Sequence, residues 1–275
     1  MKKILLLLVL SVFLFCSVYP VSAGAESYTL SMLPRFFPKK IKSMIDPLAE
    51  YLSQKTGLSI KAVLTKDFAE YEKSIKNSSI DIGYENPLVY VKVSQVHEVS
   101  AMAIKGAGGN RFRGIIIARP DSGIETIKDL KHKTIMIVGK TSAAGFLSQK
   151  ISLADNGLDP DTDCIIEVAP GNKQENVIIA VSIGDVDAGF IRESAFNVAD
   201  KYIRPGSIAV VTTCAWLPNW AFSMNRTLPD RVKIKITNAL LQLNTKNQVL
   251  KAMGLDGFQK TGDSSYDIMR SLLND

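Results

Sequence analysis

The sequence is poor in the residues that build metal centres and nucleophilic active sites. Its 275 residues include two histidines and three cysteines. His97 and His132 lie far apart along the chain, and neither stands beside a cysteine at a spacing that suits zinc or a Cys–His pair. Gly-x-Ser-x-Gly, His-Glu-x-x-His and P-loop motifs are also missing. We therefore expect no enzyme, no metal site and no cofactor.

The sequence has one long apolar run, which lies at the N-terminus, and no other along the rest of the chain. Residues 4–15 are almost wholly apolar and follow Lys2 and Lys3, and small residues come next. This is the pattern of a secretory signal peptide, which predicts a periplasmic protein. We predict cleavage after Ala23, with cleavage after Ala25 as the alternative. An uncleaved membrane anchor is disfavoured because the segment is marginal for a span of about 20 residues.

The cysteines leave one question open. Phe15 precedes Cys16 where lipid attachment requires a small residue, so we expect no lipid anchor. Cys164 and Cys214 remain in the mature chain, and an oxidising compartment permits a disulfide between them. Spacing alone does not decide between a disulfide and two free thiols.

Neither sign of charge is in large excess. There are 33 basic and 27 acidic residues, a formal charge of +6, and removing Lys2 and Lys3 with the signal peptide leaves +4. The basic residues are dispersed rather than striped, which argues against a nucleic-acid partner. A mild positive excess suits a small anionic ligand. We expect a monomer of about 250 residues, enough for two modest lobes or one large domain.

Short strands and helices alternate along the whole chain. Helices of about a dozen residues between strands predict parallel or mixed sheets with helices on both faces. A glycine-rich break at residues 106–110 separates two units of this kind. The fold class expected is therefore α/β with two lobes and a ligand cleft between them. We predict a signal peptide, a first part of lobe 1, lobe 2, and a return to lobe 1, over residues 1–23, 26–111, 112–216 and 217–275.

Three segments carry further expectations about local structure. Residues 216–220 are expected to lead the chain back to lobe 1. Residues 254–262 are expected to form a loop. A helix is expected from Thr141 or Ser142 to about Ala154.

The stretch over residues 135–147 is the centre of the predicted site. It is a buried strand followed by a turn at Lys140 and a helix start at Thr141 and Ser142. Ala143 is the next residue of the chain and is included among the candidates. Such a turn leaves backbone N–H groups unpaired at the positive end of the helix dipole, which suits an anion. Ser142 or Thr141 also serves as a helix cap in this interpretation.

Other candidate residues follow predicted strands, where ligands of open α/β sheets bind. Their side chains offer arginine forks for an oxyanion, hydrogen-bonding groups, or an aromatic wall. Surface exposure of the arginines and core packing of the aromatic residues are the alternatives. These candidates are Arg35, Tyr84, Glu85, Asn86, Arg192, Glu193 and Trp220.

Several segments resemble the phosphate, phosphite and phosphonate-binding branch of the periplasmic solute-binding proteins. IDIGYEN at residues 80–86, PDSGIETIKDL at 120–130 and GDVDA at 184–188 are similar to landmarks of that branch. So are residues 135–147 and GLDGFQKTGDSSY at 254–266. The resemblance covers nearly the whole mature chain. It implies the type II periplasmic binding protein fold, with ligand in the hinge cleft and no catalysis.

The resemblance also assigns roles to particular residues. It implies that Tyr84 contacts the ligand, that Ser142 opens the anion loop and that Glu193 is an acidic contact. The chain departs from the branch at Ala143 and Ala144, where hydroxyl residues are expected, and at residues 171–175, where a histidine is expected. These changes leave the identity of the anion open.

The function expected is capture of a small anionic solute, a phosphonate-like or phosphate-like oxyanion or a relative of one, for the permease of an ABC transporter. The alternative is a periplasmic module that reports its ligand to a membrane sensor kinase. The sequence does not separate these two partners.

Overall fold

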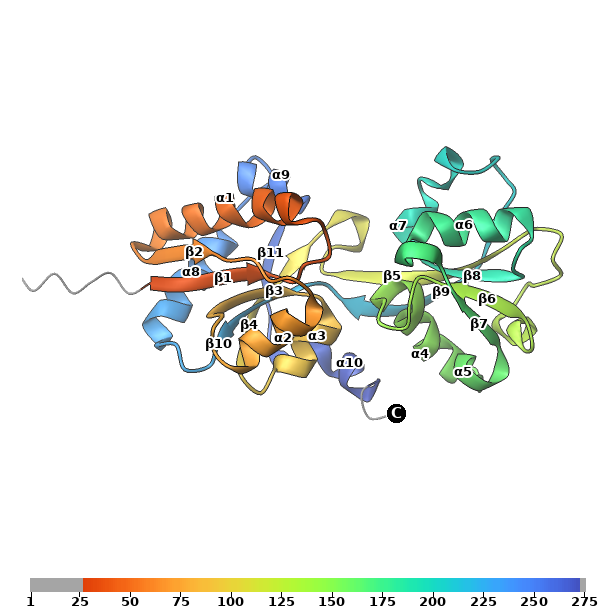
Figure 1. Ribbon diagram of the computed structural model, residues 1–275, viewed down its shortest axis with the longest axis horizontal. Helices are drawn as coiled ribbons and strands as arrows, with labels where there is room; N and C mark the ends of the chain where they lie inside the picture. Colours follow the sequence, from red (N-terminus) through yellow and green to blue (C-terminus); the bar gives the residue numbers. More distant parts are fainter. Residues whose placement is uncertain (1–26, 273–275) are drawn as a thin grey trace, which may run out of the picture.

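The computed structural model describes residues 27–272, and the predicted signal peptide, its cleavage site and Cys16 lie outside this range. The chain forms two α/β lobes, each built on one mixed sheet (Figure 1). Within residues 27–272, no helix has both the length and the apolar character needed to cross a membrane.

Lobe 1 contains a six-stranded sheet in the order β11-β4-β10-β3-β1-β2. β1 pairs in parallel with β2 and β3, whereas β10 is antiparallel to β3 and β4, and β11 is antiparallel to β4. The strands are β1 (Ser27–Met32), β2 (Ser59–Ala62), β3 (Ile82–Glu85), β4 (His97–Ile104), β10 (Ala221–Asn225) and β11 (Gly257–Lys260).

Helices cover both faces of this sheet. α1 and α9 lie on one face, with α2 and α3 on the other (Figure 1). α1 buries a stripe of apolar residues spaced three or four apart, including Ile41, Ile45, Leu48 and Leu52, which is the spacing that faces one side of a helix. The helices of lobe 1 are α1 (Pro38–Thr56), α2 (Phe68–Lys76), α3 (Pro87–Val93), α8 (Asp230–Leu241), α9 (Gln248–Met253) and α10 (Asp267–Ser271).

Lobe 2 contains a five-stranded sheet in the order β7-β6-β8-β5-β9. β6 pairs in parallel with β7 and β8, while β5 is antiparallel to β8 and β9. The strands are β5 (Arg111–Ala118), β6 (Thr134–Ile137), β7 (Ile165–Val168), β8 (Ala188–Arg192) and β9 (Ala209–Pro218). The helices are α4 (Ser148–Ala154), α5 (Pro160–Asp163), α6 (Gln174–Ile183) and α7 (Glu193–Phe196).

Two crossing segments join the lobes. The first passes from β4 to β5 through the short 3-10 turn η1 (Gly106–Gly108), and the second passes from β9 to β10 through Asn219 and Trp220. The backbone N–H of Asn219 donates to the carbonyl of Asn110 at 2.8 Å, so the two crossings are bonded to each other. A paired, two-segment connection of this kind lets one lobe rotate against the other while both sheets stay intact.

Two strands of lobe 1 were not predicted from the sequence. β10 follows directly after residues 216–220, and β11 occupies residues that were expected to be a loop. Both strands are short, and both pair with β4. Their local sequence carries little strand signal because the partner strand, far away in the chain, supplies the hydrogen bonds.

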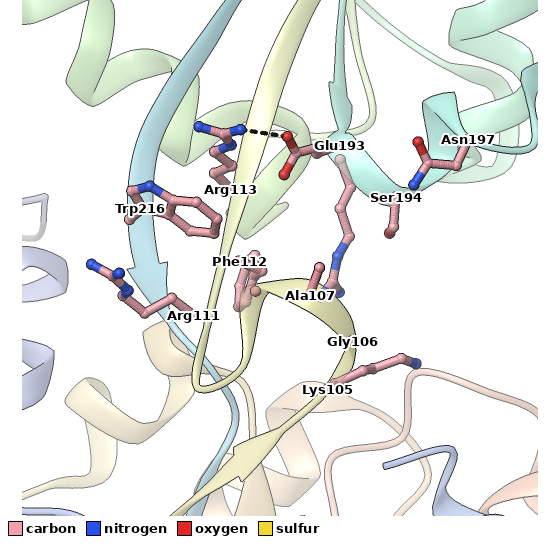
Figure 2. Close-up of a pocket in the computed structure, with 12 residues that line it drawn as sticks. Lys105, Gly106, Ala107, Arg111, Phe112, Arg113, Glu193, Ser194, Asn197 and Trp216 are labelled. Carbon is pink, nitrogen blue, oxygen red and sulfur yellow. Dashed lines mark hydrogen bonds and ion pairs between the residues drawn. The ribbon is translucent and has the colours of Figure 1, made fainter. Parts of the chain in front are cut away.

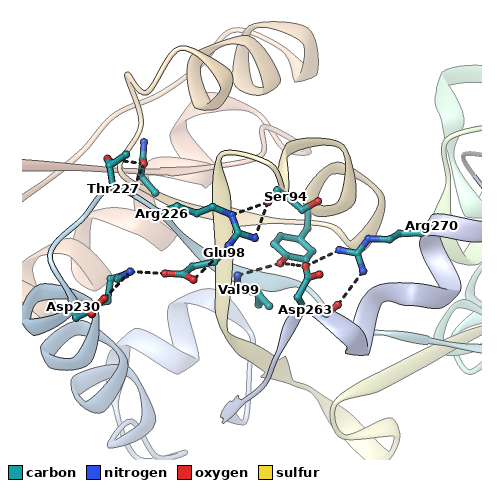
Figure 3. A network of polar contacts seen from close by, with 11 residues as sticks. Ser94, Glu98, Val99, Arg226, Thr227, Asp230, Asp263 and Arg270 are labelled. Carbon is teal, nitrogen blue, oxygen red and sulfur yellow. Dashed lines mark hydrogen bonds and ion pairs between the residues drawn. The ribbon is translucent and has the colours of Figure 1, made fainter.

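A polar network holds the C-terminal segment against lobe 1 (Figure 3). The Tyr90 hydroxyl donates to Asp263 at 2.5 Å and accepts from the backbone N–H of Val99, and Arg270 forms an ion pair with Asp263 at 2.6 Å. The ring of Tyr90 also packs on that of Tyr266, with centroids 4.7 Å apart. The chain end is thereby tied to α3 and β4.

Gln149 ties the segment after β6 to the sheet of lobe 2. Its side chain is fully buried, and its amide nitrogen lies 3.0 Å from three carbonyl oxygens, those of Ile115, Ala144 and Ile191. These carbonyls belong to β5, to the turn after β6 and to β8. One side chain therefore sets the distance between that turn and two strands.

Gln149→Leu should destabilise the protein by about 2 to 4 kcal/mol, because it keeps the volume but leaves buried carbonyl groups without a donor. Urea unfolding followed by circular dichroism measures the change. Gln54→Leu on the exposed face of α1 is the matched control and should stay within about 0.5 kcal/mol of the wild type. Equal stability of both variants would show that Gln149 does not anchor the turn.

Candidate functional site

A cleft of about 610 Å³ lies between the lobes and is lined by residues of both. Lobe 1 contributes the loop after β1, the start of α2 and the end of β3. Lobe 2 contributes the turn after β6, the turn before α6 and the end of β8. These are carboxyl ends of strands, as expected for ligand sites of open α/β sheets.

The turn after β6 presents backbone donors to the cleft. Ser142 caps the following helix, its hydroxyl oxygen accepting from the N–H of Gly145 at 3.1 Å. The N–H groups of Thr141, Ala143 and Ala144 have no partner within the described residues, and all three residues line the cleft. These N–H groups and the helix dipole make this turn suitable for an anion.

The helix after this turn differs from the expectation in its first five residues. Ala143–Leu147 forms a π-helical turn, and the α-helix α4 begins only at Ser148. The turn is held close to the loop before α6, since the Asn172 side chain donates to the carbonyl of Val138 at 2.7 Å. A Cβ atom on Gly139 would lie 2.6 Å from that same side chain, so glycine is required for this approach.

Arg35 and Arg192 bring one guanidinium from each lobe to the cleft. Arg35 lies over the Trp220 ring at 4.3 Å from the centroid, and Arg192 lies over the Phe112 ring at 4.5 Å. Neither forms an ion pair with any described residue. Stacking on a ring holds a guanidinium in place while leaving its N–H groups free for an oxyanion.

The two guanidiniums act on each other electrostatically. Burial lowers the pKa of Arg192, and the positive charge of Arg35 lowers it further. Burial between the lobes also lowers the pKa of Arg35, although its side chain faces the water of the cleft. Lys105, on the first crossing segment, has a pKa lowered by burial and by both arginines. Positive charge therefore accumulates around the cleft.

The structure turns the two predicted carboxylates away from the cleft. Glu85, the last residue of β3, is fully buried, and the Tyr71 hydroxyl donates to its Oε2 at 2.7 Å. Glu193 accepts from Arg113 Nη2 at 2.6 Å. Neither residue lines the interlobe cleft, although Glu193 lines the hinge pocket beside it, so contact of either residue with a ligand stays a prediction. Glu85 ends β3 and Glu193 follows β8, but strand position alone does not show which way a side chain points.

Lys140 is also directed elsewhere. Its ammonium group pairs with Asp161 at 2.6 Å on the exposed side of the turn, and it does not line the cleft. Asn86 does line the cleft, with its Oδ1 atom capping α3 by accepting from the N–H of Val89. Asn86 therefore lies in the cleft, as the sequence predicted, with its Oδ1 atom engaged in the cap, whereas the ammonium group of Lys140 is engaged outside the cleft.

Tyr84 lies behind the cleft wall rather than on it. It is 2% exposed and packs on Trp220, with ring centroids 5.2 Å apart. Burial raises the pKa of its hydroxyl, and the positive charges of Arg35 and Arg192 act in the opposite direction. Tyr84 therefore supports Trp220 from behind and does not itself line the cleft.

Sequence reasoning missed several residues of the cleft. Gln174 accepts from the backbone N–H of Arg192 through Oε1 at 2.9 Å, which leaves its amide N–H groups free in the cleft. Phe36, Phe68 and Phe112 add aromatic walls. Gln174 lies within residues 171–175, where the resemblance implies a histidine, and that difference was the available signal.

A second pocket of about 450 Å³ lies at the hinge, beyond Arg192 and Phe112, which line both spaces. Trp216 lies between Arg111 and Arg113, which are 5.2 and 4.5 Å from its ring centroid (Figure 2). Arg113 is bonded to Glu193. The hinge pocket is thus basic, with one of its cations already paired.

No group of His, Cys, Asp and Glu side chains among residues 27–272 has a geometry that could hold a metal ion. Cys164 and Cys214 are free thiols in this structure. Burial raises the pKa of the Cys214 thiol to about 12, so it carries no reactive thiolate near neutral pH.

Residues 30–266 match the family described as "ABC transporter, phosphonate, periplasmic substrate-binding protein". The chain belongs to this family. Its fold is the type II periplasmic binding protein fold, and the family consists of solute-binding proteins that serve ABC transporters.

Solved structures agree with this fold. A binding protein component of an ABC phosphonate transporter from Pseudomonas aeruginosa is 19% identical, covers 90% of this chain and 86% of its own, and has a TM-score of 0.65. A Prochlorococcus marinus protein in complex with methylphosphonate is 14% identical over 92% of this chain and 100% of its own, with a TM-score of 0.70.

A curated relative belongs to a different kind of protein. The tetrathionate sensor histidine kinase of Salmonella typhimurium is 23% identical over 235 residues. The match covers 79% of this chain and 40% of that kinase, so the chain spans less than half the length of this relative.

The buried position of Glu85 can be tested by the pH dependence of the unfolding free energy. Burial raises its pKa from 4.5 to about 7, so the native state binds the proton more tightly than the unfolded state does. Its stabilising effect is complete below pH 4.5 and is lost as the pH rises through 7. Between pH 4.5 and 8 the loss is on the order of 3 kcal/mol.

Glu85→Gln removes this titration. Relative to the variant, the wild type should lose unfolding free energy as the pH rises from 4.5 to 8, measured by urea unfolding at each pH. The difference between the two proteins is the readout, because His97, with its pKa lowered to about 4 by burial, changes stability with pH in the opposite direction in both. A constant difference across this range would place the carboxyl group in water.

Proposed function

We propose that this chain captures a small anionic solute in the interlobe cleft and closes around it. The observation that carries the proposal is the pair Arg35 and Arg192, which face one cleft from opposite lobes and have no carboxylate partner. Like charges brought together by closure repel each other. An anion between them converts that repulsion into attraction from both sides, so ligand binding favours the closed state.

The free N–H groups after β6 support the same proposal. They provide uncharged donors beside Arg192, and Gln174 adds a side-chain amide. Family membership supports delivery of the bound solute to an ABC permease. Oxyanions such as phosphonate, phosphite, phosphate, sulfonate and carboxylate are the candidate ligands. Methylphosphonate is added because it is bound in the Prochlorococcus marinus structure, and tetrathionate because the Salmonella typhimurium kinase is named for it.

A sensory role is the second candidate. The observation that favours it is the match of 79% of the chain to a sensor histidine kinase. The chain would then change a membrane sensor's activity on closure instead of loading a permease. A strain lacking the gene separates the two: loss of uptake of the bound solute indicates transport, and loss of solute-dependent transcription with normal uptake indicates sensing.

Thermal unfolding with a panel of these oxyanions tests ligand capture. An anion present at about 100 times its Kd stabilises the folded state by about 2.7 kcal/mol, which raises the Tm of a protein of this size by roughly 5 to 10 °C. If none of the panel raises the Tm in a concentration-dependent way, the proposed function is rejected.

Arg35→Gln and Arg192→Gln should each weaken binding of the stabilising anion at least about tenfold, because each removes a charge-assisted contact from one lobe. Isothermal titration calorimetry measures the affinity. Arg119→Gln is the matched control: it removes one positive charge from lobe 2 at an ion pair with Asp121, outside the cleft. Loss of affinity in the control alone, or in none of the variants, would contradict this site.

A further inference from the structure

The charges that line the cleft are all of one sign. Among the described residues that line it, Arg35 and Arg192 are the charged ones, and no aspartate or glutamate joins them. The carboxylates nearest in sequence are already engaged, Glu85 with Tyr71 and Glu193 with Arg113. An ammonium group on the ligand would therefore meet two cations and no counter-charge, which disfavours a zwitterionic ligand.

Aromatic side chains line the cleft beside the two cations. Phe112 and Trp220 are buried beneath the guanidiniums, whereas Phe36 and Phe68 expose 43% and 37% of their surface. Arg35 lies 4.6 Å from the Phe36 ring centroid and 4.3 Å from that of Trp220, and Arg192 lies over Phe112. A fully hydrated inorganic ion gains little from such walls. A ligand with an apolar or polarisable segment between its charged groups buries that segment against the exposed rings of Phe36 and Phe68.

The size of the cleft points the same way. At about 610 Å³ it lies in the range of roughly 300–1,000 Å³ that is typical of sites for organic ligands. Its charged groups belong to different lobes, one at the end of β1 and one at the end of β8. The loss of hydroxyl donors at Ala143 and Ala144 leaves lobe 2 with fewer groups to surround a single, highly charged phosphonate head.

We propose that the ligand is a linear dianion that carries an oxoanion group at each end of a short apolar linker and has no ammonium group. One end binds Arg35 on lobe 1. The other end binds Arg192, the free N–H groups after β6 and Gln174 on lobe 2, while the linker lies against the aromatic walls. This assignment rests on the proposed function and narrows it to one substrate class.

The positive electrostatic field of the side chains around the cleft favours a ligand with two negative charges. Lys105 at the hinge is a third positive charge, and its pKa is lowered by burial and by both arginines and is raised in part by Asp256. A monoanion would leave one of the two facing guanidiniums without a counter-charge on closure. A dianion provides one negative group for each.

Two matched series with a three-carbon linker test the class. Propane-1,3-disulfonate, propane-1-sulfonate and 3-aminopropane-1-sulfonate differ only at one end, and glutarate, butyrate and 4-aminobutyrate form the carboxylate series. In at least one series the dianion should bind at least about tenfold more tightly than the monoanion, and the zwitterion should bind most weakly. Isothermal titration calorimetry at low salt gives the three affinities.

Variants show whether the second charge acts through the predicted residues. In Arg35→Gln and Arg192→Gln the ratio of dianion to monoanion affinity should fall toward one, because one end has lost its cation. Arg119→Gln should keep the wild-type ratio. An unchanged ratio in both cleft variants would overturn the assignment of one end to each arginine.

The outcomes separate this inference from the proposed function. If a panel oxyanion such as methylphosphonate or phosphate binds but neither dianion exceeds its monoanion, the substrate class is overturned and the proposed function stands. A zwitterion that binds as tightly as its dianion has the same consequence. If neither the panel nor the two series binds, both proposals are rejected.

Discussion

The unpaired charge of Arg35 and Arg192 across one cleft is the constraint on which the account of this protein depends. Each guanidinium is held over an aromatic ring instead of a carboxylate. An aromatic ring fixes the position and direction of a guanidinium but does not neutralise its positive charge, so that charge remains available to a ligand. Because the two residues belong to different lobes, the free-energy difference between the proposed open and closed states depends on whether an anion lies between the two guanidiniums.

The rest of the fold positions these two groups. The loop after β1 carries Arg35, and the end of β8 carries Arg192, so each sits at the carboxyl edge of its own sheet. Gln149 and Asn172 hold the turn after β6 against β5, β8 and the loop before α6. The two crossings are hydrogen-bonded to each other near Asn219. A two-segment hinge of this kind permits rigid lobes to close over a cleft, which is the motion that we propose.

The sequence predicted much of this architecture, for physical reasons that are local. Periodic apolar residues, helix caps such as Ser142 and glycine ends such as Gly57 depend on neighbours within a few positions, so the two α/β units could be read directly. β10 and β11 could not, since their strand character comes from pairing with strands far away in the chain, β10 with β3 and β4 and β11 with β4.

The candidate site was predictable to the level of segments but not of side chains. The turn after β6 and the ends of β1 and β8 were recognised from strand position. Whether Glu85 points toward the cleft or toward Tyr71 depends on packing between β3 and α2, which the sequence does not display. The same holds for Glu193, whose partner Arg113 lies 80 positions away. Long-range pairing, rather than local pattern, decides which polar groups remain free for a ligand.

The central claim is that an anion bound between Arg35 and Arg192 holds the lobes together, and a crystal structure of the protein with its stabilising anion bound tests it most directly. The account predicts that both guanidiniums donate to oxygen atoms of the ligand at about 2.7–2.9 Å. It also predicts that the lobes are rotated toward each other relative to the ligand-free protein. A ligand whose acidic groups contact only one arginine, or that occupies the hinge pocket beside Trp216 instead, would contradict it.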